Sequence, residues 1–188
     1  MYSVVIHSPH DLRVDQIDQP GAPEPGTITV QIDKGGICGS DLHYYHNGGF
    51  GTVKIREPMV LGHEVAGTII AVGQNVTGLA VNDKVAVNPS MPCNQCQYCR
   101  ANMRNQCTDM RFFGSAMRFP HQQGLFRQQI NLPAEQLVKL SPDINMEHAA
   151  CSEPLAVCLH AVRQAGALSG KKVLVSGCGP IGCLTILA

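Results

Sequence analysis

The stretch from residue 62 to residue 72, GHEVAGTIIAV, places two potential metal ligands directly before a run of β-branched residues. Val, Ile and Thr favour strands and the glycine at position 73 favours a turn, so the run from Val65 to Val72 predicts a strand. His63 and Glu64 stand at its start, and imidazole and carboxylate groups are common zinc ligands. The stretch therefore predicts a strand that begins at a candidate metal site.

Other segments of the first 140 residues have the same strand pattern. Polar and apolar residues alternate from Thr27 to Ile32, which is the period of a half-buried strand. Similar runs follow at Lys84 to Val87, Leu125 to Ile130 and Leu137 to Leu140. Such spacing, with no helix expected in between, predicts a mainly β domain with an antiparallel, barrel-like or sandwich architecture.

The pattern changes after Ser141-Pro142-Asp143. We expect Ser152 to cap a helix whose first turn contains Glu153 and which ends at Gly166. The short apolar run from Val173 to Val175 predicts a buried strand, and an apolar helical segment follows to the end of the chain.

A glycine-rich turn, Gly177-Cys178-Gly179-Pro180-Ile181-Gly182, separates that strand from that helix. In a dinucleotide-binding turn Gly177 would permit the tight turn, Gly179 the approach of a pyrophosphate, and Gly182 close packing of helix on strand. By itself the motif is equally compatible with an ordinary strand-to-helix turn. The remaining strands of such a fold, and its ribose-binding acid about 20 residues on, would lie beyond Ala188. We therefore expect the chain to be a fragment that is inactive alone.

The composition argues against several classes of protein. The 188 residues include 14 basic and 14 acidic side chains, so there is no basic excess for nucleic acid or an anionic membrane. The N-terminal residues lack a signal-peptide pattern, and no apolar run is long enough to span a bilayer. Nine cysteines, an odd number, fit metal binding in a reducing cytoplasm better than a secreted disulfide framework.

Four of the cysteines have the spacing of a structural zinc site. Two residues separate each of the first three, and the fourth follows after seven more: Cys93, Cys96, Cys99 and Cys107. Four thiolates can close a tetrahedron around zinc and stabilise a loop that has little core-forming sequence. Free cysteines and disulfides are the simpler alternatives. An iron–sulfur cluster is a third, although ferredoxin-type runs place Cys-Pro three residues after the third cysteine.

A second, open metal site is predicted from Cys38, in the glycine-rich stretch GGICGSD of residues 35–41, together with His63. A catalytic zinc takes about three protein ligands and leaves one position for water or substrate. Glu64 and Glu153 are both candidates for the third ligand. Each of these residues, taken singly, is also compatible with a packed or capping side chain.

Together these motifs resemble the zinc-containing medium-chain dehydrogenases, and the resemblance extends over essentially the whole chain. It implies a GroES-like catalytic domain over residues 1–145, with a structural zinc lobe at about 88–110, and the truncated start of a Rossmann domain over 146–188. In the polyol branch of that family Glu-Pro-Leu replaces another zinc-ligating cysteine, as in Glu153-Pro154-Leu155 here. The segment from Cys107 to Pro120 resembles the members that oxidise L-idonate, a sugar acid, to 5-keto-D-gluconate; a sorbitol- or xylitol-type activity is the alternative.

The resemblance also implies roles for single residues. Ser40 would take the proton of the substrate hydroxyl and His43 would pass it outward, unless His43 is simply a solvated side chain. Tyr45 and Arg111 would reach polar groups of the substrate, or else make surface contacts. It further implies two zinc ions per subunit, one catalytic and one structural, NAD or NADP as cofactor, and a homo-oligomer, dimer or tetramer, in the cytoplasm. The alternative of a different class is a zinc-stabilised interaction module without catalysis.

Overall fold

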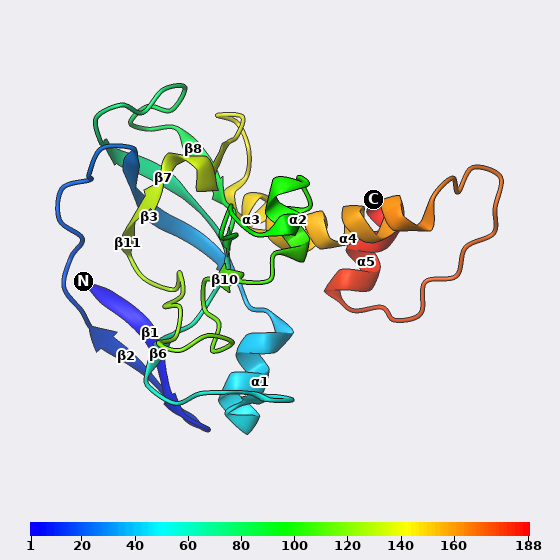
Figure 1. The fold of residues 1–188 in the computed structure, drawn as a ribbon, viewed down its shortest axis with the longest axis horizontal. Coiled ribbons are helices and arrows are strands. Elements are labelled where there is room, and N and C mark those ends of the chain that lie inside the picture. Colours follow the sequence, from blue (N-terminus) through cyan, green and yellow to red (C-terminus); the bar gives the residue numbers. More distant parts are fainter.

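A computed structural model of the protein describes all of residues 1–188, and most of it is one antiparallel β domain (Figure 1). Its main sheet has five strands in the order β11-β3-β7-β8-β12, and every neighbouring pair is antiparallel. The bounds are β3 Thr27–Gly36, β7 Glu64–Val72, β8 Lys84–Val87, β11 Gln129–Pro133 and β12 Leu137–Lys139. The predicted mainly β, antiparallel fold is confirmed.

A second sheet closes one side of this domain. It has three strands in the order β2-β1-β6, with the bounds β1 Tyr2–Ser8, β2 Asp11–Gln16 and β6 Met59–Val60. The backbone of Val4 joins it to the rest, because its N–H donates to Phe126 (2.8 Å) and its carbonyl accepts from Leu61 (3.1 Å). The two sheets together therefore form a continuous curved wall.

The core lies inside this wall and explains the alternation in the sequence. The largest cluster combines residues of all five strands of the main sheet with two from the connecting segments: Ile28, Val30, Val65, Ile69, Val85, Val87, Phe113, Leu125, Leu132 and Leu137. A smaller cluster under the second sheet contains Ile6, Tyr44, Met59, Leu61 and Ala116. Because successive strand residues point to opposite faces, the largest cluster takes every second residue of β3 (Ile28, Val30) and of β8 (Val85, Val87).

Two expectations for the β domain were wrong, and two strands were missed. A helix, α1 (Gly39–Asn47), interrupts the strands, and β1 and β2 were not predicted. The expected strand from Leu125 to Ile130 begins only at Gln129, where β11 starts. Before that point the chain pairs elsewhere, since the amides of Leu125 and Phe126 donate to the carbonyls of Gly62 and Leu61 at 2.9 Å each.

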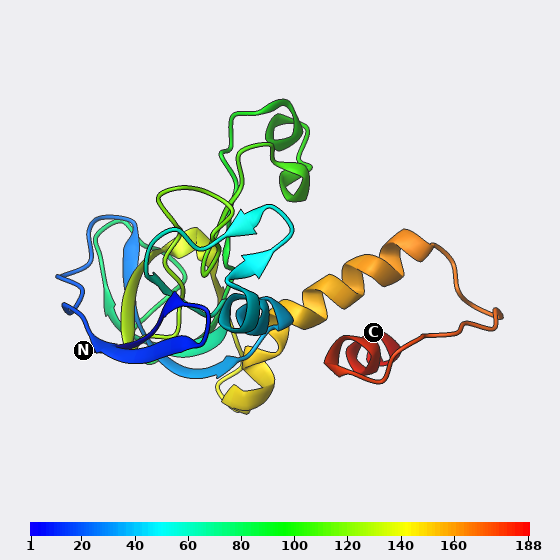
Figure 2. The ribbon, with the colours of Figure 1, turned by 90° about the horizontal axis from the view of Figure 1, so that it is seen from below.

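Short elements form two small lobes beside the main sheet. The hairpin β4 (Gly49–Phe50) and β5 (Val53–Lys54) follows α1, and the pair β9 (Ser90–Met91) and β10 (Arg111–Phe112) forms the neck of a separate loop. That loop contains α2 (Gln97–Arg100) and the 3₁₀ turn Arg104–Gln106, and another 3₁₀ turn, Ala134–Gln136, joins β11 to β12. Figure 2 shows the neck and its loop projecting away from the sheet.

The C-terminal residues leave the β domain as helices. They form α3 (Met146–Ala150), α4 (Ser152–Ala165) and α5 (Pro180–Leu187), and α4 extends outward with α5 folded back beside it (Figures 1 and 2). Gly166, at φ 74°, ends α4 as predicted. Ser152 is the first helical residue and not the cap, because Cys151 takes the cap position without a side-chain bond. None of the helices is long and apolar enough to cross a membrane.

The strand expected from Val173 to Val175 does not form. This segment has no ladder partner, and Val173 and Leu174 are 59% and 91% exposed. A parallel strand needs neighbours for its backbone groups, and residues 1–188 place no strand beside it. The prediction of a buried strand at this position is therefore wrong for residues 1–188, because the segment has no partner strand.

Leu132 on β11 tests the packing of the main core, because its side chain is fully buried within the largest cluster. Leu132→Ala should lower the free energy of unfolding by about 2–5 kcal/mol through lost burial and the cavity left behind. Urea unfolding of the zinc-loaded protein measures this. Val138→Ala, at a position 57% exposed on β12, is the control and should change stability by less than about 0.5 kcal/mol. Equal effects at the two positions would contradict the assignment of the core.

Candidate metal centres and active site

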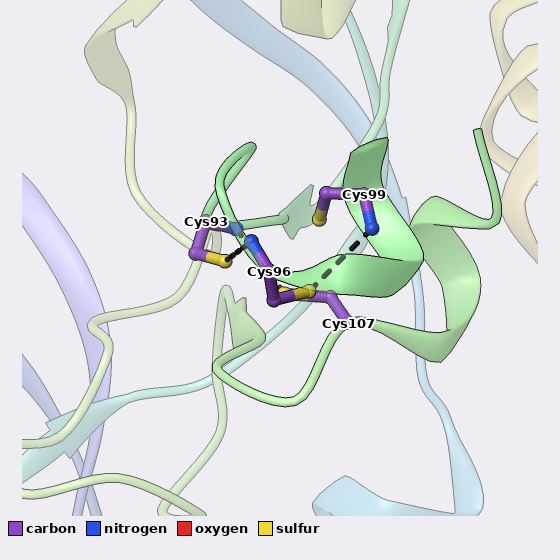
Figure 3. A group of neighbouring side chains, drawn as sticks. All are labelled: Cys93, Cys96, Cys99 and Cys107. Carbon is purple, nitrogen blue, oxygen red and sulfur yellow. Dashed lines mark hydrogen bonds between the residues drawn. The ribbon is translucent and has the colours of Figure 1, made fainter. Parts of the chain in front are cut away.

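The loop beyond the β9–β10 neck brings four cysteines together. The sulfur atoms of Cys93, Cys96, Cys99 and Cys107 lie within 4.8 Å of one another (Figure 3). Cys96 is the N-cap of α2 and Cys99 lies within that helix, so one turn of helix positions two of the sulfurs. No disulfide joins them, since all nine cysteines of the chain are free.

Backbone amides face three of these sulfurs and lower the pKa of Cys96 and Cys107, whereas burial raises the pKa of Cys99. The amide of Cys93 donates to the sulfur of Cys107 (3.2 Å), that of Cys96 to Cys93 (3.4 Å) and that of Cys99 to Cys96 (3.5 Å). The bond from Cys99, followed by one from Thr108, lowers the pKa of Cys96 to about 5. Amides that stabilise thiolates create a site that fits a cation.

A second group of potential ligands lies where α1 meets β7. The ligand atoms of Cys38, His63 and Glu64 lie within 4.8 Å of one another. Cys38 is the N-cap of α1, and Glu64 is the first residue of β7. Gly36 pairs with Glu64 across β3 and β7, and a Cβ at Gly36 would overlap the carboxylate of Glu64. The glycine therefore makes room for this carboxylate beside Cys38.

Asp41 holds the two halves of this group in place. Its carboxylate is buried and accepts the amide of Cys38 at 3.0 Å and the amide of Gly62 at 3.2 Å. One side chain thus joins the turn that carries Cys38 to the turn that carries His63, although the two turns are far apart in sequence. Gly62 adopts φ 88°, and a side chain there would also meet the ring of Phe126.

The electrostatics of this group also fit a bound cation. Hydrogen bonding to His63 lowers the pKa of the Cys38 thiol, while burial raises the pKa of both Glu64 and Glu153. Burial acts against protonation of His63, but its bond to Cys38 and the charge of Asp41 outweigh this and raise its pKa. The buried Nδ1 of His63 has no hydrogen-bond partner. One imidazole among acidic groups, with an unpartnered nitrogen, is the donor set that zinc prefers.

Glu153 lies close to this group but outside it. It is the second residue of α4, near enough to His63 and Glu64 for their charges to act on its pKa. Its carboxylate is not among the ligand atoms that lie within 4.8 Å of one another. Glu153 lines a cavity of about 550 Å³ between α4 and the sheet, together with Phe112, Val157 and His160. Both glutamates therefore remain candidates for the third ligand.

The other predicted residues are placed very differently. Ser40 is half-buried in the first turn of α1 and hydrogen-bonds to Cys38, which contributes to the lowered pKa of that thiol. His43 is exposed one turn further on, with its ring 6.1 Å from that of Phe50. The ring of Tyr45 lies near the far end of α1, 5.2 Å from that of His10, so the structure does not bring it to the metal ligands.

Arg111 is exposed on β10, and its guanidinium donates to the carbonyl of Pro120 at 3.5 Å. The next residue, Phe112, packs its ring edge-on against that of His63, with ring centroids 5.3 Å apart. Because neighbouring strand residues point to opposite faces, Arg111 points away from His63. The sequence analysis missed Phe112. It also missed Asp41, which the three-residue spacing of a capping box after Cys38 could have indicated.

The glycine-rich turn has part of the geometry that was predicted for it. Gly177 adopts φ 115°, Gly179 is the N-cap of α5, and Pro180 is its first residue. A Cβ at Gly182 would overlap the carbonyl of Gly177, so this glycine allows the helix to approach the turn closely. Ile181 is 51% exposed, and a Cβ at Gly177 or Gly179 would meet no atom within 4 Å.

Comparison with known proteins now defines the family. Residues 24–142 match the alcohol dehydrogenase GroES-like domain. The chain belongs to this family. It is 52% identical over 163 residues to the L-idonate 5-dehydrogenase (NAD(P)(+)) of Escherichia coli strain K12, a match that covers 87% of this chain and 47% of that protein. The predicted resemblance to the zinc-containing medium-chain dehydrogenases is confirmed.

Solved structures and a further relative agree with this assignment. The crystal structure of L-idonate 5-dehydrogenase from E. coli superimposes with a TM-score of 0.90 at 47% identity, over 98% of this chain and 52% of that one. A probable D-xylulose reductase A of Neosartorya fischeri is 38% identical over 97% of this chain and 50% of its own length. This GroES-like chain thus spans about half the length of the relatives it matches.

Asp41→Ala should weaken metal binding at the Cys38–His63 group by about 10- to 100-fold, because the two turns lose their common acceptor. Competition with a chromophoric chelator measures the affinity of each bound zinc separately. Asp33→Ala, which removes an exposed carboxylate bonded to Thr68, is the control and should leave both affinities unchanged. An Asp41→Ala protein with unaltered metal affinity would show that the hydrogen bonds to Asp41 are not needed for metal binding.

Cys96→Ser should remove the metal of the four-cysteine loop and leave the β domain folded, since the loop extends from the β9–β10 neck and contributes no residue to the buried core clusters. Limited proteolysis should then cut within residues 92–110, while the remaining fragments keep their β circular-dichroism signal. Cys151→Ser changes an exposed cysteine outside both metal groups and should give the wild-type digestion pattern. Cleavage spread over the whole Cys96→Ser chain would contradict an independent, metal-stabilised loop.

Proposed function

We propose that this chain supplies the catalytic domain of a zinc-dependent dehydrogenase that oxidises a secondary alcohol of a sugar acid, L-idonate to 5-keto-D-gluconate, with NAD or NADP. The observation that carries the proposal is an open group of ligands, Cys38, His63 and Glu64, on the same GroES-like domain as a closed group of four cysteines. The similarity to L-idonate 5-dehydrogenase supports this choice of substrate.

Cys38 and His63 would hold the catalytic zinc, and Glu64 or Glu153 would complete its protein ligands. A bound zinc ion supplies Lewis-acid polarisation of the substrate hydroxyl, which makes its proton easier to remove. The four cysteines would hold the second, structural zinc, giving two ions per subunit. The two glutamates lie close enough to influence each other's charge, so exchange between them during turnover is part of the proposal.

Ser40 is proposed to accept the proton of the substrate hydroxyl. Its own hydroxyl lies beside Cys38, next to the open side of the ligand group. His43 follows three residues later on the same face of α1 and is exposed, so it can pass the proton to solvent. The cavity lined by Glu153 and Phe112 gives a substrate space to approach the ligands from the side of α4.

The nucleotide would bind at the glycine-rich turn of Gly177, Gly179, Pro180, Ile181 and Gly182. This assigns residues 1–145 to the catalytic domain, with the structural zinc lobe at about 88–110, and residues 146–188 to the connecting helix and the first part of a Rossmann domain. Because the segment from Val173 to Val175 has no partner strand, we expect this polypeptide by itself to form no NADH with any substrate.

Two other functions remain candidates for specific reasons. The 38% identity to a D-xylulose reductase favours a sorbitol- or xylitol-type activity as the second choice. A non-catalytic zinc-stabilised module would need the four cysteines but would leave the open ligand group unexplained. We also propose a cytoplasmic homo-oligomer, dimer or tetramer, acting on small molecules and not on nucleic acid or membranes.

Ser40→Ala tests the catalytic assignment in a zinc-loaded protein with a complete nucleotide-binding domain. Loss of the proton acceptor should lower kcat for L-idonate by about 10²- to 10⁴-fold with both zinc ions retained. NADH formation gives the rate, and elemental analysis gives the metal content. Ser8→Ala, at an exposed serine of β1, should retain wild-type activity. A Ser40→Ala enzyme of wild-type rate would exclude Ser40 as the proton acceptor, and a wild-type enzyme that prefers xylitol would favour the second function.

A further inference from the structure

Lys54 and Arg56 are exposed basic residues whose charged groups have no acidic partner in the protein. Neither forms an ion pair, whereas Lys34, Arg118 and Lys139 each pair with a carboxylate. A lysine ammonium and an arginine guanidinium together offer eight N–H donors. The side chains of Lys54 and Arg56 are therefore available to bind an anionic ligand.

These two cations line one cavity of about 310 Å³, together with Thr52, Val53, Ala116 and Met117. This volume is at the lower end of the range of small-molecule sites, roughly 300–1,000 Å³. The cavity has no acidic residue in its lining, so nothing in it opposes an anion. Lys54 and Arg56 also border a cavity of about 420 Å³ on their other side, but Glu57 lines that one and disfavours an anion there.

The position of Arg56 is fixed by its surroundings. Its guanidinium carbon lies 4.4 Å from the centre of the Phe119 ring, and its amide donates to Nε2 of the buried His121 at 2.8 Å. The other ring nitrogen of His121 donates to the carbonyl of Arg118 at 2.9 Å. A guanidinium stacked on an aromatic ring keeps its N–H edges free, so it is prepared to bind a carboxylate at little further entropic cost.

The cavity is connected to the proposed catalytic residues through two series of contacts. Phe50 pairs with Val53 in the β4–β5 hairpin, and its ring is 6.1 Å from that of His43. On the other side, the chain runs from Phe112, which packs on His63, to Ala116, whose amide donates to the hydroxyl of Tyr44 at 3.0 Å. The four-residue step from Phe112 to Ala116 spans at most about 14 Å. Gly114 lies within it at φ 67° and makes a turn that shortens this distance.

We infer that Lys54 and Arg56 bind the carboxylate of the substrate, and that this site selects a sugar acid over the corresponding polyol. The inference rests on the proposed function, because only a sugar acid has a carboxylate to place there. With the reacting hydroxyl at the metal ligands, the carboxylate end of a six-carbon acid would extend past His43 and Phe50 to the β4–β5 hairpin. A polyol of the same length carries no charge and gains nothing from the two cations.

The test compares L-idonate with L-iditol, which differs only in having a CH₂OH group in place of the carboxylate. Lys54→Gln and Arg56→Gln, each in a protein with a complete nucleotide-binding domain, should lower kcat/KM for L-idonate by at least about tenfold and change kcat/KM for L-iditol by less than about twofold. Lys54→Arg and Arg56→Lys keep the charge and should recover most of the selectivity. Arg13→Gln, which changes a distant exposed arginine on β2, is the charge-matched control.

Each outcome separates this inference from the proposed function. Equal losses for both substrates would show that Lys54 and Arg56 are merely structural, and would overturn the inference. Unchanged selectivity in these variants, with a loss in Arg111→Gln instead, would transfer the carboxylate site to Arg111. Wild-type protein that oxidises neither L-idonate nor L-iditol would refute the proposed function itself.

Discussion

The buried carboxylate of Asp41 is the interaction on which the open metal group depends. It accepts hydrogen bonds from the amides of Cys38 and Gly62. These bonds fix the relative position of two turns that are far apart in the sequence. A buried carboxylate is costly unless it is hydrogen-bonded; each oxygen of Asp41 accepts one amide, although burial still raises its pKa. The same bonds begin helix α1 at Cys38, because Asp41 is the third residue of that helix and closes its capping box. Metal ligands, helix start and strand start are thereby determined together.

The two groups of potential metal ligands differ in design. The four cysteines lie on a loop with little apolar sequence, whose fold would depend on a bound metal. The open group lies on the main sheet, whose folding is provided by the buried core of β3, β7 and β8. The two are linked through β10, since Arg111 and Phe112 end the cysteine loop and Phe112 packs on His63. The structural loop therefore also places one wall of the cavity beside the proposed active site.

The sequence was sufficient where a feature is local. Cysteine spacing, β-branched runs and the glycine after α4 predicted the metal loop, the central strands and the helix end, because neighbouring residues determine each of them. The sequence did not predict the features that depend on contacts between segments far apart in the chain. The segment from Val173 to Val175 has strand-forming residues but no partner, Leu125 pairs with Gly62 instead of continuing β11, and Tyr45 lies at the wrong end of a helix that was not expected. Asp41 was overlooked because its partners become neighbours only in the folded chain.

X-ray absorption spectroscopy of the zinc-loaded chain tests most directly the claim that one domain holds a closed and an open metal centre. The account predicts two zinc ions per chain with an average of about 2.5 sulfur ligands per zinc, since one site has four thiolates and the other has one. The remaining scattering should come from nitrogen and oxygen at about 2.0–2.2 Å. A single zinc with four sulfur ligands would contradict the open centre, and with it the proposal that this domain performs chemistry.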